Sequence, residues 1–207
     1  MADKATIILS GSGTGGPVVP QLAVMEEIRS MRDDVDFVWV GTDEGPARKL
    51  VSTKGIPFYT IAAGKLRRYF SLLNVTDVFK VLIGFFQSIF LLLKLRPKVI
   101  VSFGGFVSVP LTWVGGLLRV PVHIHQLDVR PGLANKLMAK VASGITVGFS
   151  EAAGVFENDK VKVVGNPIAK EVVEKLDNSK DLRKSAQEFF HLDNGFPTLL
   201  VIGGGTG

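Results

Sequence analysis

The chain contains no cysteine, which excludes disulfide bonds, a thiolate nucleophile and any cysteine-based metal site. It has only three histidines, and His123 and His125 on one side of a strand have no evident third ligand, so we expect no bound metal. No charged and then apolar leader precedes the first strand pattern, which makes a cytosolic location the default. Aromatic residues do not interleave with the basic ones, so we expect no nucleic-acid partner.

The positive charge of the chain is unevenly placed. The 207 residues carry a formal net charge of +5, which favours an anionic partner such as a nucleotide or an acidic membrane surface. Within one stretch, only Asp77 opposes the cations Lys65, Arg67, Arg68, Lys80, Lys94, Arg96 and Lys98.

The apolar pattern predicts a parallel α/β sheet over residues 1–164. Short apolar runs alternate with amphipathic stretches, which is typical of strands joined by crossover helices. We expect strands at residues 5–9, 37–40, 58–62, 98–102, 120–125, 144–147 and 161–164. We expect helices at residues 18–31, 44–54, 77–95, 108–118 and 132–142. Together these elements predict one complete Rossmann-like domain.

Residues 165–207 predict the start of a second domain. The sequence Gly165-Asn166-Pro167 indicates a boundary turn, and residues 171–190 a helical region broken near 177–179. Residues 198–202 predict a buried strand that opens onto a glycine-rich run, as residues 6–9 do at the beginning. We therefore expect an incomplete copy of a two-domain protein, inactive by itself.

Residues 77–95 form a long apolar helix pattern with one narrow polar stripe. One interpretation is a fully buried core helix. The basic flanks and the phenylalanines favour a helix that lies on an anionic membrane, with contacts from Arg67, Arg68, Phe79, Phe86 and Phe90. The uninterrupted apolar run is too short to cross a bilayer, which takes about 20 residues.

Two glycine turns follow strands of the same predicted sheet. Residues 11–16 match the dinucleotide-binding spacing, and Asp43 could bind a ribose, so a nicotinamide-dependent oxidoreductase is one alternative. Gly104 and Gly105 form the second turn. Loops at the carboxyl ends of parallel strands line one crevice, and several of them favour a large polyanionic substrate.

These motifs, taken in order, resemble the MurG family of UDP-N-acetylglucosamine transferases of peptidoglycan synthesis. The resemblance rests on residues 13–24, 64–67, 101–110, 125–128, 132–136 and 164–168. It implies the glycosyltransferase B architecture, with an N-terminal acceptor domain and a C-terminal donor domain. It also implies inverting transfer of N-acetylglucosamine from UDP-N-acetylglucosamine to a polyprenyl-pyrophosphate-linked muramyl-peptide acceptor, without cofactor or metal.

The chain departs from the family pattern at several positions. Pro17 replaces the histidine that usually follows Thr-Gly-Gly, and Ala169 replaces an arginine that meets the donor. Where the family has His-Glu-x-Asn, residues 125–128 read His-Gln-Leu-Asp. The serine of the family's donor loop corresponds to Gly205, with Thr206 beside it.

The expected site residues lie at the carboxyl ends of the strands. We expect Asp128 to contact substrate and act as the base, with His125 as its partner; alternatively, Asp128 caps a turn and His125 binds backbone. The donor and its diphosphate would meet Thr14, Gly15, Gly16, Asp128, Gly205 and Thr206. The acceptor would meet Gly13, Gly104, Gly105, Phe106 and Asn135, although Asn135 could instead brace its helix.

The resulting expectation is a peripheral enzyme on the cytoplasmic face of the cell membrane. An alternative is a non-catalytic, membrane-docking acceptor subunit of a split glycosyltransferase, whose donor half is a separate chain.

Overall fold

The computed structural model describes residues 4–11, 15–43, 45–64, 73–156, 159–177, 179–192 and 197–201. The chain divides into two compact units, Met1–Pro167 and Ile168–Gly207. The first unit carries the sheet and every site residue discussed below that the structure describes.

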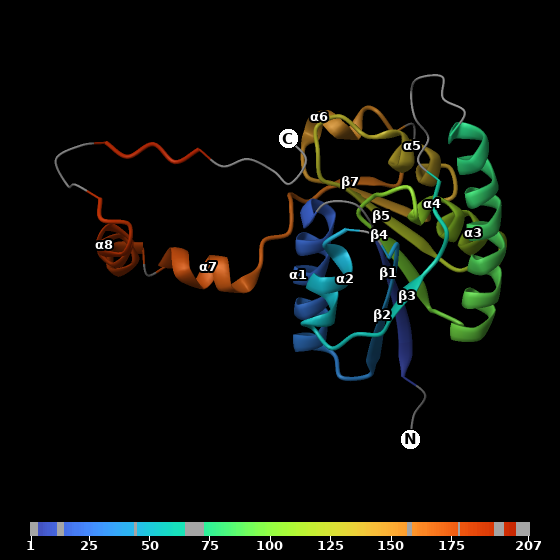
Figure 1. Cartoon of the computed structure of the whole chain (residues 1–207), viewed down its shortest axis with the longest axis horizontal. Coiled ribbons are helices and arrows are strands. Elements are labelled where there is room, and N and C mark those ends of the chain that lie inside the picture. The colour runs from blue at the N-terminus through green and yellow to red at the C-terminus, as the bar shows by residue number, and fades with distance from the viewer. Residues whose placement is uncertain are drawn as a thin grey trace. The chain divides into compact units, whose positions relative to one another are not determined.

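The first unit is built on a parallel sheet of seven strands in the order β3-β2-β1-β4-β5-β6-β7 (Figure 1). The strands are β1 (Ala5–Ser10), β2 (Val35–Gly41), β3 (Phe58–Thr60), β4 (Val99–Ser102), β5 (Val122–Gln126), β6 (Gly144–Val147) and β7 (Val161–Val163). The helices are α1 (Gly15–Met31), α2 (Ala47–Ser52), α3 (Leu73–Leu95), α4 (Ser108–Leu117), α5 (Leu133–Ala139) and α6 (Ser150–Ala153). The predicted parallel α/β fold is confirmed.

The strand order reverses between β1 and β4, which are neighbours in the sheet although β2 and β3 separate them in sequence. Such a switch point opens a crevice at the carboxyl ends of the strands, because the connections leave in opposite directions. Here the Ser10 hydroxyl at the end of β1 lies 2.9 Å from the hydroxyl of Ser108, the first residue of α4.

Two apolar cores cover the two faces of the sheet, because successive strand residues point to opposite sides. Leu9 packs with Leu22 and Met25 of α1, while its neighbour Ile8 joins the core of α4 that contains Leu111. Accordingly, α1 and α2 lie on one side of the strands and α3 and α4 on the other (Figure 1).

Helix α3 packs on the unit through one side that combines small, polar and apolar residues. Gly84, Ser88 and Leu92 are buried, and the Ser88 hydroxyl donates to the Gly84 carbonyl oxygen at 2.7 Å. A Cβ on Gly84 would collide with the carbonyl oxygen of Ala62. The Gln87 side-chain oxygen accepts from the backbone N–H of Ala62 at 2.7 Å. Close packing at Gly84, the Gln87 hydrogen bond and partly buried apolar side chains such as Phe85 and Leu91 therefore hold the helix to the domain, while other large apolar side chains remain exposed.

Several element boundaries differ from the expected ones by a few residues, as at α2 and α5, which are shorter than expected. Helix α1 begins at Gly15 rather than at residue 18, because Pro17 is compatible with the first turn of a helix. Helix α6 was not expected, since its four residues carry too little periodicity to reveal it.

The second unit contains α7 (Lys170–Asp177) and α8 (Ser179–Phe189). Two separate helices agree with the prediction of a helical region broken near 177–179. The expected strand at 198–202 is wrong over its described residues 198–201, which are not assigned to a strand and are exposed. A strand with two apolar faces needs a neighbouring ladder and covering helices, and no described strand pairs with these residues.

Candidate functional site

A cleft of about 620 Å³ lies within the first unit at the carboxyl ends of the strands. Its described lining brings together the beginning of α1, the second glycine turn, the segment after β5, the beginning of α5 and the turn after β7. Residues distant in sequence meet here because parallel strands end at one edge of the sheet.

The glycine turn at one wall of the cleft requires glycine. Gly104 and Gly105 have φ angles of 111° and 101°, a region that side chains with a Cβ rarely adopt. A Cβ on Gly104 would also lie 3.2 Å from the Asn135 side-chain oxygen. Gly104, Gly105 and Asn135 thus line the cleft together. Phe106 is half-buried and is not among the described lining residues.

Another wall is the N-terminal turn of α1. Gly15 and Gly16 are its first residues, and Gly16 and Pro17 line the cleft. A helix N-terminus attracts anions through its free N–H groups, although Pro17 supplies none. The expected contacts Gly13, Thr14, Gly205 and Thr206 lie outside the described residues.

Asp128 is exposed and lines the cleft. No ion pair or side-chain hydrogen bond of its carboxylate is found among the described residues. No other charged residue is among the described lining residues of the cleft. The described wall therefore presents one free carboxylate, which can accept a hydrogen bond or a proton from a ligand hydroxyl.

His125 is not the partner of Asp128, contrary to expectation. Its Nδ1 lies 2.9 Å from the Thr146 hydroxyl, and its Nε2 lies 3.2 Å from the Asn166 side-chain oxygen. The His125 ring also packs against Phe103 with 4.7 Å between the ring centroids. Both ring nitrogens are thus engaged away from Asp128.

The hydrogen bonds assign the protonation of this histidine. Asn166 donates from Nδ2 to the Leu127 carbonyl oxygen at 3.1 Å, so its oxygen accepts from His125 Nε2–H. In the neutral ring His125 Nδ1 then accepts from the Thr146 hydroxyl, and the Thr146 oxygen accepts from His123 Nε2–H at 3.0 Å. Burial lowers the pKa of His125; the Asn166 bond partly offsets this, and the charge of His123 adds to it.

Two site residues were not predicted as such. Asn166 lines the cleft and binds both His125 and Leu127, whereas the sequence indicated only a boundary turn there. Gln126 is buried and accepts from Asn135 Nδ2 at 2.5 Å. The position of Asn166 just after the last strand, at the same edge of the sheet, could have indicated its role.

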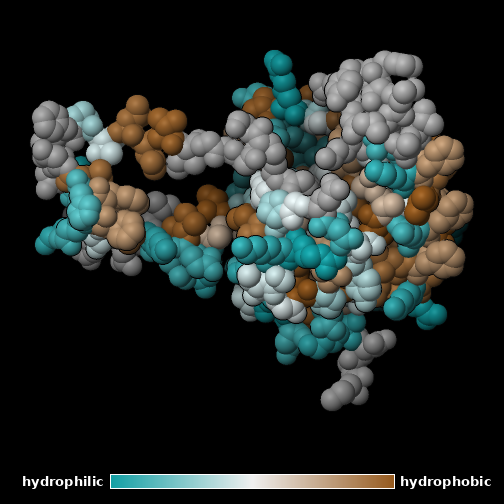
Figure 2. Space-filling view, viewed as in Figure 1, coloured by the Kyte–Doolittle hydropathy of each residue, from teal (hydrophilic) through white to brown (hydrophobic). Residues whose placement is uncertain are grey.

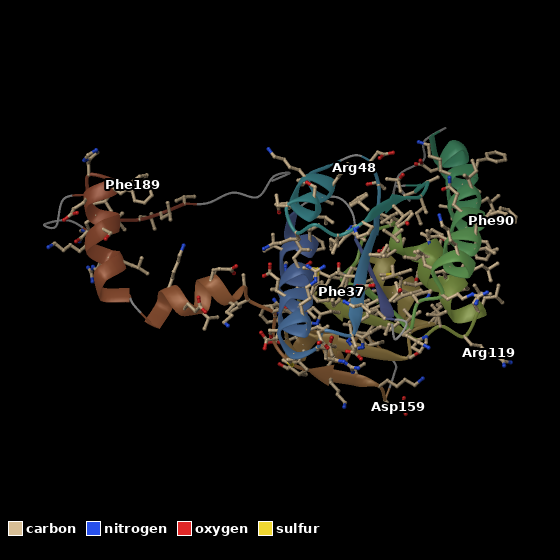
Figure 3. The ribbon with its side chains drawn as sticks, turned by 90° about the horizontal axis from the view of Figure 1, so that it is seen from below. Phe37, Arg48, Phe90, Arg119, Asp159 and Phe189 are labelled. Atoms are coloured by element: carbon tan, nitrogen blue, oxygen red, sulfur yellow. The ribbon has the colours of Figure 1, made fainter. Side chains whose placement is uncertain are left out.

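A separate candidate surface is the outer side of α3. Phe79, Phe86 and Phe90 are 62%, 60% and 73% exposed. Figure 2 shows apolar surface over α3 at the right of the view, and Figure 3 shows Phe90 pointing away from the sheet. Exposed Leu82 and Leu93 extend the same surface. Arg67 and Arg68 lie outside the described residues.

By length and composition alone, residues 77–95 of α3 are apolar enough to cross a membrane. The expectation that its uninterrupted apolar run is too short for a crossing stays a prediction, because this criterion tolerates charged residues within the segment. The helix also packs against α4 and binds Ala62, so one of its sides belongs to the domain.

No group of three or more histidine, aspartate or glutamate side chains that could hold a metal occurs in the part of the chain that the structure describes. Asp43, the residue considered for a ribose, forms an ion pair with Arg48 at 2.6 Å.

Comparison with known proteins places this geometry in a family. Curated relatives named UDP-N-acetylglucosamine--N-acetylmuramyl-(pentapeptide) pyrophosphoryl-undecaprenol N-acetylglucosamine transferase include one from Bacillus cereus, 39% identical over 97% of this chain. One from Clostridium kluyveri is 37% identical, also over 97% of this chain. The chain spans 55% of the length of each of these two relatives.

Solved structures agree with the sequence comparison. A crystal structure of MurG from Acinetobacter baumannii is 25% identical with a TM-score of 0.65, covering 81% of this chain and 46% of that one. A UDP-GlcNAc 2-epimerase from Neisseria meningitidis has a TM-score of 0.61 at 11% identity over 92% of this chain and 54% of its own, which shows the fold alone.

The family resemblance inferred from the ordered motifs is confirmed, and it disfavours the oxidoreductase alternative. Residues 7–147 match the glycosyltransferase family 28 N-terminal domain. Strands β2 to β6, most of β1 and most of the cleft wall fall within this range, and β7 lies beyond it. The chain belongs to glycosyltransferase family 28.

Proposed function

We propose that this chain takes part in the transfer of N-acetylglucosamine from UDP-N-acetylglucosamine to a polyprenyl-pyrophosphoryl-muramyl-peptide acceptor. The named relatives, 36–39% identical over nearly all of this chain, support this reaction. Residues 1–164 would bind the acceptor and the membrane, and residues 165–207 would begin the donor domain. Because the chain spans about half of each relative, the proposal concerns the acceptor end of the reaction first.

The observation that carries the proposal is the free carboxylate of Asp128 in the cleft. In an inverting transfer the acceptor hydroxyl attacks the anomeric carbon, while the bond from that carbon to the diphosphate oxygen breaks. The hydroxyl proton must go to a base within hydrogen-bond reach. Asp128 fills this role, since His125 has no ring nitrogen free for it.

The diphosphate of a substrate would lie by the beginning of α1, another part of the cleft wall. The backbone N–H groups of Gly15 and Gly16 and the helix dipole favour an anion there. The Asp128 carboxylate would repel a phosphate from its own end of the cleft. The roles of Gly13, Thr14, Gly205 and Thr206 remain predictions from the resemblance.

The test measures acceptor binding and sugar transfer separately. A water-soluble acceptor analogue with a short prenyl chain is titrated into the chain by calorimetry, and labelled UDP-N-acetylglucosamine is then added. We expect the analogue to bind, and Asp128→Asn to weaken its binding about tenfold, as loss of a charged hydrogen bond would. The matched control is Asp159→Asn, a described aspartate outside the cleft lining. Absence of binding would overturn the proposal.

Acceptor binding without transfer is the expected result for this chain by itself, because it spans only 55% of its relatives. Co-purification with a separate donor-domain protein, and transfer only when that protein is added, would favour the alternative of an acceptor subunit in a split enzyme.

We further propose that the outer side of α3 rests on the cytoplasmic face of an anionic membrane. The support is an apolar surface formed by Phe79, Leu82, Phe86, Phe90 and Leu93. Lys80 and Lys94 stand exposed beside it. Long apolar side chains with adjacent lysines are typical of interfacial helices.

Sedimentation with vesicles tests this surface. We expect the chain to sediment with vesicles that contain phosphatidylglycerol, and salt to weaken the binding, because the lysines act through screened electrostatics. Failure to bind any anionic vesicle at low salt would contradict the proposal.

A further inference from the structure

The segment that carries Asp128 has no regular secondary structure, yet three side-chain hydrogen bonds hold its backbone and that of the end of β5 before it. The carbonyl oxygen of Leu127 accepts from Asn166 Nδ2 at 3.1 Å, and that of Asp128 accepts from Gln126 Nε2 at 2.8 Å. The carbonyl oxygen of His125 accepts a longer bond of 3.4 Å from Asn135 Nδ2. Each donor is a side-chain carboxamide, and we call Gln126, Asn135 and Asn166 the amide cage.

The amide cage joins three parts of the fold. Gln126 ends β5, Asn135 belongs to α5, and Asn166 follows β7. Asn135 Nδ2 also donates to the Gln126 side-chain oxygen at 2.5 Å, which fixes the orientation of both amides. Gln126 and Asn135 are 2% and 5% exposed, so water competes little for these bonds.

Carboxamides suit this task because they donate hydrogen bonds without carrying charge. A lysine or arginine at the same places would also satisfy the carbonyl oxygens, but it would neutralise the nearby Asp128 carboxylate. The arrangement carries a free-energy cost, since the buried Asn135 side-chain oxygen has no hydrogen-bond partner among the described residues. Packing of α5 alone does not explain a buried amide that leaves its oxygen unsatisfied.

We propose that the amide cage positions Asp128, so that Gln126, Asn135 and Asn166 are positioning residues for the carboxylate in the cleft. This inference rests on the proposed function, in which Asp128 receives the proton of the acceptor hydroxyl. Fixed peptide groups on either side of Asp128 keep its carboxylate in one position. Binding of the ligand then costs less conformational entropy, because this segment is already ordered.

Two nearly isosteric substitutions remove donors of the cage. Gln126→Glu and Asn166→Asp each replace an amide N–H with a carboxylate oxygen that faces a backbone carbonyl oxygen. Asn166→Asp keeps an oxygen that can accept from His125 Nε2, so it separates the cage from the histidine bond. The matched control is Thr146→Val, which breaks the bonds to His123 and His125 but leaves the cage intact.

The decisive measurement is nitrogen-15 relaxation of the backbone amides in the whole chain. We expect the order parameters of residues 127–129 to fall in both cage variants, while those of the strands and those of the Thr146→Val variant stay at the wild-type level. Unchanged order at residues 127–129 in both cage variants would overturn the inference. An equal fall in the Thr146→Val variant would overturn it as well.

Binding of the soluble acceptor analogue provides the second readout. We expect each cage variant to bind the analogue about tenfold more weakly, and Thr146→Val to bind it as the wild type does. Cage variants that lose order but bind the analogue with wild-type affinity would overturn the positioning role. If the wild-type chain binds no analogue, the proposed function fails, and the relaxation experiment still decides whether the cage holds the segment.

Discussion

Helices α3 and α4 are both strongly apolar and lie next to each other, yet they present opposite surfaces. Helix α4 lies between the sheet and α3 and buries Pro110, Leu111 and Val114. Helix α3 is the outer layer and leaves Phe86 and Phe90 largely exposed. The apolar content of a helix therefore does not tell whether it is core or surface; its layer in the fold decides that.

The contrast between α3 and α4 also appears in which residues α3 turns toward the domain. A surface helix normally buries its apolar stripe and exposes its polar one. Helix α3 buries Gly84, Ser88 and Leu92 and packs Phe85 and Leu91 partly against the core, while Phe79, Phe86 and Phe90 remain largely exposed. This exposed apolar surface is the basis of the proposed membrane contact.

The largest expected difference is in folding stability. Leu111→Ala in α4 should lower the free energy of unfolding by about 2–5 kcal/mol, because it leaves a cavity in a packed core. Phe90→Ala in α3 should change it by less than about 0.5 kcal/mol, because the side chain is 73% exposed. Urea unfolding followed by circular dichroism measures both, and equal losses would contradict the assignment of α3 as a surface layer.

For vesicle binding, substitutions in α3 should have the large effect. The double variant Phe86→Glu and Phe90→Glu should reduce binding to anionic vesicles about 100-fold, since each buried phenylalanine contributes about 1.5–3 kcal/mol. The matched control carries Met31→Glu and Val155→Glu, two exposed apolar residues outside α3. Sedimentation measures both variants, and equal loss in the control would assign the effect to added charge.

Much of the fold was predictable because strand and helix periodicity are local properties. All seven strands and the break between α7 and α8 follow from apolar runs and turn residues. The strand expected at 198–202 was wrong over residues 198–201, because a strand depends on partners that a local pattern does not show.

The candidate site was only partly predictable. Gly104, Gly105, Asp128 and Asn135 were named from motifs, and the structure brings all four to one cleft. The pairing of His125 with Thr146 and Asn166, rather than with Asp128, depends on side-chain direction across three strands and could not be read from spacing.

A smaller change in folding stability, of unusual sign, is expected where Gly84 of α3 packs closely against Ala62 after β3. Alanine in place of glycine normally stabilises a helix by about 0.5–1 kcal/mol. Gly84→Ala should instead destabilise the chain by about 1–3 kcal/mol, because its Cβ would collide with Ala62.

A glycine with free space around it provides the control for the Gly84→Ala substitution. Gly154 has a φ of −69° and no atom near its added Cβ, so Gly154→Ala should be neutral or slightly stabilising. Thermal unfolding of both variants checks the contrast. Stabilisation by Gly84→Ala would show that α3 is not held closely at this point.

The smallest expected effect is a change of stability with pH that distinguishes the two histidines of β5 from the exposed carboxylates. Burial lowers the pKa of His123 and of His125, so the unfolded chain binds more protons than the folded chain below about pH 6.5. Stability should therefore fall as the pH is lowered from 7.5 to 5.5, a range above the ordinary titration of aspartate and glutamate. Asp34 and Glu151, whose pKa values are lowered chiefly by hydrogen bonds, lose their contribution to stability only in more acidic solution.

Urea unfolding at several pH values should show this dependence of stability on pH in the wild type and a weaker one in a variant that carries both His123→Asn and His125→Asn. An unchanged slope in that variant would mean that neither histidine loses its proton on folding, and the neutral hydrogen-bond order through Thr146 would then be wrong.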